Sequence, residues 1–115
     1  DLGDGDNVTG PGIGDANIEI DGNDKVYISF SQLDTTSFLG LLTNASGSFV
    51  ESTAVNNVGG ASPNAIGVKG DGSLKVIAYD VSIRAATKDG SSAWQDELVK
   101  SGSGAGRFMD ATLNE

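Results

Sequence analysis

Acidic side chains crowd the beginning of this 115-residue chain, in an arrangement suited to holding a metal ion. Seven of its 16 acids fall within the first 24 residues, and that stretch contains no Lys or Arg. These seven acids are Asp1, Asp4, Asp6, Asp15, Glu19, Asp21 and Asp24. Carboxylates this close together repel one another unless a cation neutralises them, and calcium prefers oxygen ligands of this kind.

Two short segments carry these oxygens on a backbone that can curl, because one surrounds Gly5 and the other surrounds Gly22. Their side chains are our candidate calcium ligands: Asp4, Asp6, Asn7, Asp21, Asn23 and Asp24. Calcium is the one cofactor that the sequence suggests. Neither segment has the full pattern of an EF-hand loop, so the competing interpretation is ordinary turn chemistry on a solvated surface.

The residue types that most enzymes depend on are missing from the chain. It has no cysteine and no histidine, which removes disulfides, thiolate nucleophiles, Cys-ligated zinc and the commonest general base. The Gly-rich stretches at residues 10–14 and 102–106 do not match a phosphate-binding loop. Paired carboxylates would need a substantial cleft to act as a glycosidase. We therefore predict that the protein is not an enzyme.

The charge and the hydropathy of the chain limit its partners and its location. A net charge of −9 argues against nucleic acid, whose phosphates would be repelled. No apolar run is long enough to span a bilayer, so no membrane span is predicted. The chain begins with Asp and not Met, which fits an exported protein whose leader is removed. We expect an extracellular or cell-surface location, with a virion as the alternative.

Alternation of apolar and polar residues predicts strands along most of the chain. Residues 17–31 are expected to form a hairpin with its turn at 21–24, and 70–73 to form a second hairpin turn. Further strands are expected at residues 48–55, 65–69, 74–86 and 107–113. Residues 34–43 and 92–100 have apolar side chains at helical spacing, so each is predicted to be a short helix.

The number of strands predicts an all-β fold. A chain of this length suits a single antiparallel β-sandwich, Ig-like or jelly-roll-like, with one or two short helices. We assign residues 17–115 to this β-sandwich domain. Residues 1–16 are rich in Gly and Asp and contain Pro11, so they are predicted to form an extended acidic N-terminal arm.

The arm has three isolated apolar residues that would suit contacts between subunits: Leu2, Val8 and Ile13. An extended segment with sparse apolar anchors can add as a strand to an open sheet edge of a neighbouring subunit. We therefore expect a structural subunit that assembles with copies of itself, into an extracellular filament, a pilus or a virion, with calcium assisting. The competing interpretation of the arm is a leader without a partner.

A binding module is the alternative function, either an adhesin or a carbohydrate-binding sandwich of a larger surface protein. Trp94 and Tyr79 are the aromatic residues that would stack on sugar rings, although their patterned positions favour the core. Asn7 and Asn44 each begin an N-x-[ST] triplet, which accepts a glycan in some exported proteins. Such triplets also arise by chance in a chain rich in Asn, Ser and Thr.

Overall fold

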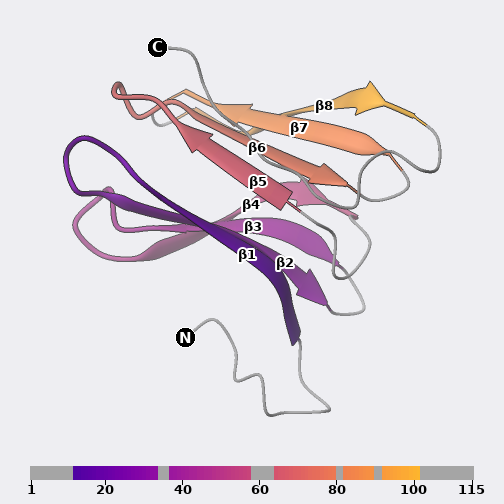
Figure 1. The fold of residues 1–115 in the computed structure, drawn as a ribbon, viewed down its shortest axis with the longest axis horizontal. Coiled ribbons are helices and arrows are strands. Elements are labelled where there is room, and N and C mark those ends of the chain that lie inside the picture. Colours follow the sequence, from indigo (N-terminus) through magenta and orange to yellow (C-terminus); the bar gives the residue numbers. More distant parts are fainter. Residues whose placement is uncertain (1–11, 34–36, 58–63, 80–81, 90–91, 102–115) are drawn as a thin grey trace.

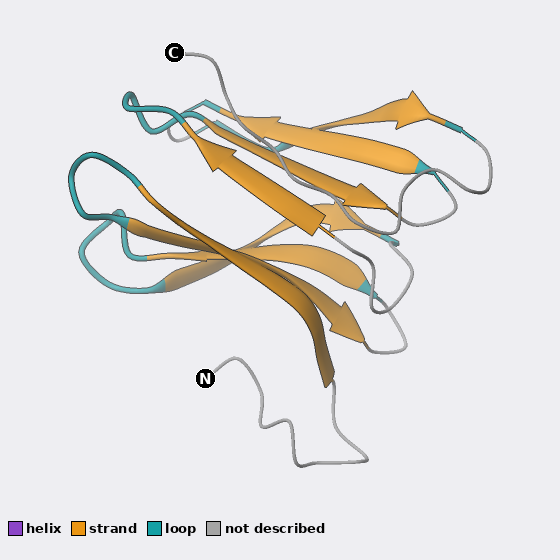
Figure 2. Ribbon diagram, viewed as in Figure 1, coloured by secondary structure: helices purple, strands orange, loops and turns teal. Residues whose placement is uncertain are grey.

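Two antiparallel sheets of four strands each make up the fold, and Figure 1 shows them as two layers. The structure is a computed structural model that describes residues 12–33, 37–57, 64–79, 82–89 and 92–101. Within these residues the chain forms strands, loops and turns, and no helix, as Figure 2 shows. The prediction of an all-β fold is therefore confirmed for the described part of the chain.

Each sheet consists of four strands that follow one another in the chain. The first sheet has the order β1 (Gly12–Ile20), β2 (Val26–Leu33), β3 (Phe38–Thr43) and β4 (Val50–Asn56). The second sheet has the order β5 (Asn64–Val68), β6 (Leu74–Tyr79), β7 (Ile83–Lys88) and β8 (Gln95–Lys100). Both are antiparallel meanders, so the strand order among the described residues differs from the Greek-key order of Ig and jelly-roll sandwiches.

The first hairpin of each sheet has the same turn. The residue after the first strand, Asp21 or Lys69, donates its N–H to a carbonyl four residues on, at 3.0 and 2.9 Å. The fourth turn residue is left-handed in both, with φ of 59° at Asp24 and 85° at Gly72. This combination of a tight turn and a left-handed residue suits the twist of the strands. Both predicted hairpin turns are thus confirmed.

One hydrophobic core contains side chains from both sheets. Its buried members are Tyr27, Leu39, Leu41, Ala54 and Val55 from the first sheet, and Ile66, Leu74, Val76 and Ala86 from the second. On β3 and β6 these residues recur at alternate positions, as expected for strands with one face turned inward. The burial of this apolar surface is the main force that holds the two layers together.

The helix predicted at residues 34–43 is wrong for the part that the structure describes, because β3 occupies Phe38–Thr43. Leu39 and Leu41 point into the core and are fully buried. Phe38 and Leu42 lie on the opposite face of the same strand. A strand with apolar residues on both faces forms a continuous apolar run, and its spacing then also matches one side of a helix.

The helix predicted at residues 92–100 is also wrong, since β8 runs from Gln95 to Lys100 and pairs with β7. Ser92, the expected helix cap, shapes the turn after β7. Its Oγ accepts the N–H of Asp89 at 3.1 Å, and its own N–H donates to the Asp89 carbonyl at 3.0 Å. The same residue types cap helices and stabilise turns, so the sequence signal was ambiguous.

The long strand predicted at residues 74–86 is two antiparallel strands, because the chain reverses between Tyr79 and Ile83, which are paired. At the other end of the chain, the predicted strand at residues 107–113 lies outside the described residues. The first strand begins at Gly12, within the segment predicted to be an arm. Residues 12–16 therefore belong to the first sheet, where Gly12 pairs with Leu33.

Gly40 leaves the space that an aromatic ring fills on the outer face of the first sheet. It lies directly opposite Phe30, whose side chain is 1% exposed, and a Cβ at Gly40 would overlap the Phe30 ring. Phe38 packs edge-on against the same ring, with 6.2 Å between the centroids. Covering a strand glycine with an aromatic ring is a known device for stabilising a sheet.

Replacing Gly40 with Ala should therefore destabilise the protein. The added methyl group displaces the buried Phe30 ring, and overpacking of this kind costs about 1–3 kcal/mol. The measurement is urea unfolding followed by circular dichroism. Gly22→Ala is the matched control, because no atom lies within 4 Å of a Cβ at Gly22, and it should change stability by less than about 0.5 kcal/mol. Equal stability of the two variants would contradict the packing described.

Candidate functional site

Asp21, a predicted calcium ligand, has its carboxylate engaged within its own turn. One oxygen accepts the N–H groups of Asn23 at 2.8 Å and Lys25 at 3.0 Å, and the other accepts the Tyr27 hydroxyl at 3.2 Å. The hydrogen bond from Lys25 contributes most to holding the pKa of Asp21 below its ordinary value. This carboxylate therefore acts as the organiser of the first hairpin turn.

Only some of the other predicted ligands are among the described residues. Asn23 and Asp24 lie exposed in the same turn, while Asp4, Asp6 and Asn7 are outside the described residues. Among the residues that the structure describes, no three or more acidic side chains gather as a metal site would require. Calcium binding therefore stays a prediction for all six candidate ligands.

The turn role of Asp21 predicts an acid-sensitive contribution to stability. Because its pKa is lower in the folded chain, the contribution is complete above the unfolded value, 3.8, and is lost as pH falls through the folded value. Asp21→Asn keeps a side-chain oxygen that accepts hydrogen bonds but does not titrate. Its unfolding free energy should fall less steeply below about pH 4 than that of the unchanged chain.

The control for that measurement is Asp21→Ala, which removes the acceptor together with the charge. It should be less stable than the unchanged chain at neutral pH, where Asp21→Asn retains the hydrogen bonds of the turn. Unfolding in urea at several pH values between 2 and 7 gives the comparison. Parallel pH curves for the unchanged chain and Asp21→Asn would contradict the role assigned to this carboxylate.

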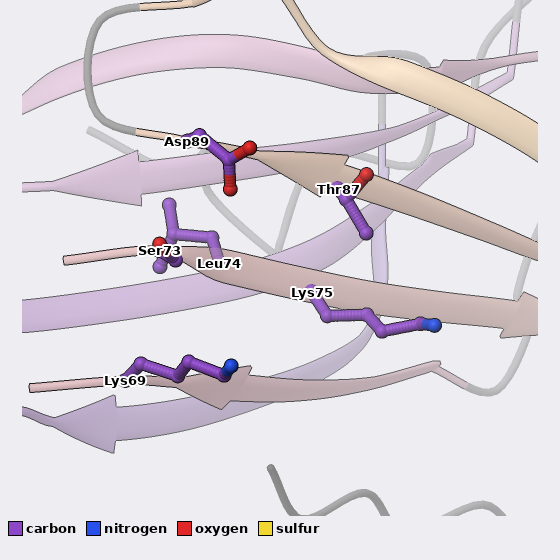
Figure 3. Close-up of a pocket in the computed structure, with 6 residues that line it drawn as sticks. All are labelled: Lys69, Ser73, Leu74, Lys75, Thr87 and Asp89. Atoms are coloured by element: carbon purple, nitrogen blue, oxygen red, sulfur yellow. The ribbon is translucent and has the colours of Figure 1, made fainter. Parts of the chain in front are cut away.

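A shallow pocket of about 280 Å³ lies at one end of the second sheet. Its lining consists of Lys69, Ser73, Leu74, Lys75, Thr87 and Asp89. Figure 3 shows the two lysine side chains extended in the same direction on neighbouring strands. Within the described residues, no hydrogen bond joins a lysine amine to either hydroxyl. The pocket thus lacks the nucleophile and base pairing that covalent catalysis requires.

Of the two residues considered for sugar stacking, only Trp94 has a described side chain. Trp94 is half-buried against the core, its Nε1 donates to Ser52 Oγ at 3.2 Å, and Lys88 Nζ lies 5.8 Å from its ring centroid. The side chain of Tyr79 lies outside the described residues. Trp94 therefore serves as a contact between the sheets, which is the core role that its position suggested.

Only one of the two N-x-[ST] triplets begins at a residue that the structure describes. Asn44 lies in the turn between β3 and β4, and its side-chain oxygen accepts the N–H of Val26 at 2.8 Å. Asn7 is outside the described residues. The Asn44 side chain thus contributes a hydrogen bond that joins its turn to β2, whether or not it carries a glycan.

One side of the two-layer fold is closed by a polar network around Asn64, which is 3% exposed. The side-chain oxygen of Asn64 accepts Ser29 Oγ at 2.6 Å and Asn17 Nδ2 at 3.2 Å. Its side-chain nitrogen donates to the Asp15 carbonyl at 2.8 Å, and Asn17 Nδ2 also donates to the Asn64 carbonyl at 2.7 Å. Strand β5 is thereby fixed against β1 and β2.

Removing the Asn64 side chain should weaken the whole fold. Asn64→Ala leaves the buried Ser29 hydroxyl without this partner, which costs about 1–3 kcal/mol, and also removes a hydrogen bond to the Asp15 carbonyl. The melting temperature should fall accordingly in calorimetry. Asn56→Ala is the control, because Asn56 is exposed on β4 and its backbone carbonyl is retained. Similar melting of both variants would show that the network contributes nothing.

The opposite side, between β4 and β8, is more open. Strand β4 lies against β7 and less closely against β8. Arg84 bridges this side, because its Nη1 donates to the Asn56 carbonyl at 3.4 Å while Nη2 pairs with Asp96. All six residues of β8 are exposed.

The exposed large apolar side chains of the described residues fall in two groups. Ile18 and Ile20 lie on the edge strand β1 and are 62% and 58% exposed. The others lie around the open side: Phe49, Val50, Leu98 and Val99. Sequence reasoning placed none of the six in a functional role, because an apolar residue in a strand pattern is expected to face the core.

The residues predicted to contact another subunit lie at or before the beginning of the described chain. Leu2 and Val8 are outside the described residues, and Ile13 lies in β1 opposite Gln32. A position within the subunit's own sheet engages the backbone of Ile13, which leaves Leu2 and Val8 as the anchors of the preceding segment.

Comparison with known proteins gives no family assignment. No family model, curated protein or solved structure matches this chain. Within the described residues, no helix has the length and apolar character needed to cross a membrane. The function is therefore argued from the surface of the molecule itself.

Proposed function

We propose that this protein is a structural subunit that assembles with copies of itself outside the cell or on a virion. The observation that supports this is the exposure of six large apolar side chains in two separate groups. Exposed apolar residues that gather at sheet edges are typical of surfaces that bind another chain. Two different groups on one subunit suit a head-to-tail contact, which generates rings or filaments.

The distribution of charge supports the same arrangement. Residues 1–57, which contain the first sheet, carry nine acids and one base. Residues 58–115, which contain the second sheet, carry seven acids and six bases. Two acidic halves repel each other, whereas an acidic half next to a nearly neutral half does not. Contact between unlike halves of neighbouring subunits is therefore favoured.

In this proposal the two sheets form a β-sandwich, and the residues before Gly12 act as the donated arm. Calcium would assist by neutralising the carboxylates of that segment, including Asp4 and Asp6. A cation is useful there because a chain with a net charge of −9 repels its own copies. The proposal names no catalytic residue and no substrate.

The test of this proposal is the size of the purified chain in solution. Light scattering and negative-stain microscopy should show particles larger than one subunit, with more of them as sodium chloride is raised from about 10 to 150 mM. Salt shortens the Debye length from about 30 to 8 Å and so weakens the repulsion between subunits. A chain that stays monomeric at all concentrations and ionic strengths would contradict self-assembly.

A cation comparison tests the calcium part separately. At matched ionic strength, calcium at about 1 mM should promote assembly more than sodium does, and Asp4→Asn with Asp6→Asn should remove that advantage. Magnesium serves as the control divalent ion, because it holds its water more tightly and demands stricter geometry. Equal effects of the three salts would mean that cations act only by screening.

A further inference from the structure

We propose that the open side between β4 and β8 receives residues 2–8 of a second copy as an added strand. This inference rests on the proposed self-assembly and names its donor and its acceptor. The acceptor is called the β4 slot here, and its limits are Val50 at one end and Leu98 at the other. The donor is the segment with the apolar anchors Leu2 and Val8.

The β4 slot has the two properties that strand addition requires. Strand β4 pairs with β3 on one side, and no described strand pairs with its other edge. The edge strand of the other sheet on this side is β8, which lies less closely against β4 than β7 does. Leu98 pairs with Arg84, which reaches across to the Asn56 carbonyl, so Leu98 faces the first sheet. It is nevertheless 61% exposed, because no described strand lies beneath it.

The other end of the β4 slot has a second uncovered apolar residue. Val50 lies in register with Thr43, which pairs with the core residue Tyr27, so Val50 faces the second sheet. It is 51% exposed. An added strand beside β4 would cover Val50 at one end and Leu98 at the other, and it would give the other edge of β4 a partner.

The spacing of the arm matches the spacing of the slot. Strands β4 and β8 run the same way, because Trp94 contacts Ser52 while Arg84, the partner of Leu98, contacts Asn56. Leu98 thus lies near the Asn56 end, six residues or about 20 Å along β4 from Val50. Leu2 and Val8 are also six residues apart, so an extended arm has both on one face at the same separation.

The charge of the arm suits the middle of the slot. Asp4 and Asp6 share the face of Leu2 and Val8, so they would lie between the two anchors. Arg84 lies at the Leu98 end of that stretch, and its side chain is 32% exposed. Asp96 already pairs with it, and Lys88 lies four residues further along the same face of β7, beyond Ala86. The arm has no base, so its carboxylates would compete with Asp96 for these cations.

The donor must be a second copy, because the arm of the same chain is too short. Gly12 begins β1, and the slot lies beyond β4, four strand spacings or about 19 Å away across the sheet. The register places Gly12 and Asn56 at the same end of that sheet, so this is the shortest path. The four residues from Val8 to Gly12 span at most about 14 Å.

The experiment uses two full-length variants that each disable one partner. Val8→Asp has a defective donor arm and an intact β4 slot. Leu98→Asp has a defective β4 slot and an intact donor arm. Each alone should lose assembly, with association weakened at least tenfold, because a buried anchor is replaced by a charge. When the two variants are mixed, one junction can form, so light scattering should show pairs of subunits that grow no further.

Matched controls keep this result specific. Thr9→Asp adds the same charge to the opposite face of the arm and should assemble like the unchanged chain, whereas Ile18→Asp places the charge in the other exposed apolar group, on β1. Melting curves check that Leu98→Asp still folds, and Val50→Asp is the second slot variant. Assembly that is lost in Ile18→Asp and kept in Leu98→Asp would overturn the proposal, as would a mixture that stays monomeric.

A peptide with the sequence of residues 1–11 separates this inference from the function that it rests on. It should bind the Val8→Asp chain at one peptide per chain, and the same peptide with Val8→Asp should bind at least tenfold more weakly. Peptide binding together with an unchanged chain that never assembles would keep the slot and refute self-assembly. Assembly without peptide binding would refute the slot, including the case in which residues 102–115 of the same chain fill it.

Discussion

The buried amide of Asn64 is the interaction on which the arrangement of the two sheets depends. Apolar packing brings the layers together without fixing their relative position, because it is not directional. Asn64 adds direction, since its side chain bonds to Ser29 and to the backbone of Asp15 while Asn17 bonds back to it. With β5 held against β1 and β2, the position of every other strand follows from the meander order.

Fixing one side of the layers determines what happens at the other. Strand β4 is the last of its sheet and lies mainly against β7, so β8 has little beneath it. Trp94 and Arg84 reach across to β4, but each contributes only one hydrogen bond to it. The uncovered Leu98 is therefore a consequence of the register set at Asn64, and the open side belongs to the architecture of the fold.

Local signals in the sequence were sufficient to predict the hairpin turns but insufficient to predict how the two sheets pack. The Asp21 turn could be predicted because its Gly and Asp residues stabilise it through neighbours in the chain. The strand at Phe38–Thr43 could not, because its apolar residues face both sides and its partners are distant. The role of Asn64 was equally hidden, since its partners lie 35 to 49 residues away and the residue itself resembles part of a polar loop.

The two meanders are built alike, and their differences explain why one subunit would need another. Both have connections of the same length, at residues 21–25 and 69–73 and again at 44–49 and 89–94. Yet residues 1–57, which contain the first, carry nine acids and one base, and the edge strand β8 of the second is exposed along its whole length. Two halves of equal charge and equal edge exposure would cover each other within one chain or form a symmetric dimer. Halves that differ in net charge and in the exposure of their edge strands leave apolar side chains uncovered at each edge. A second copy in the same orientation can cover those side chains.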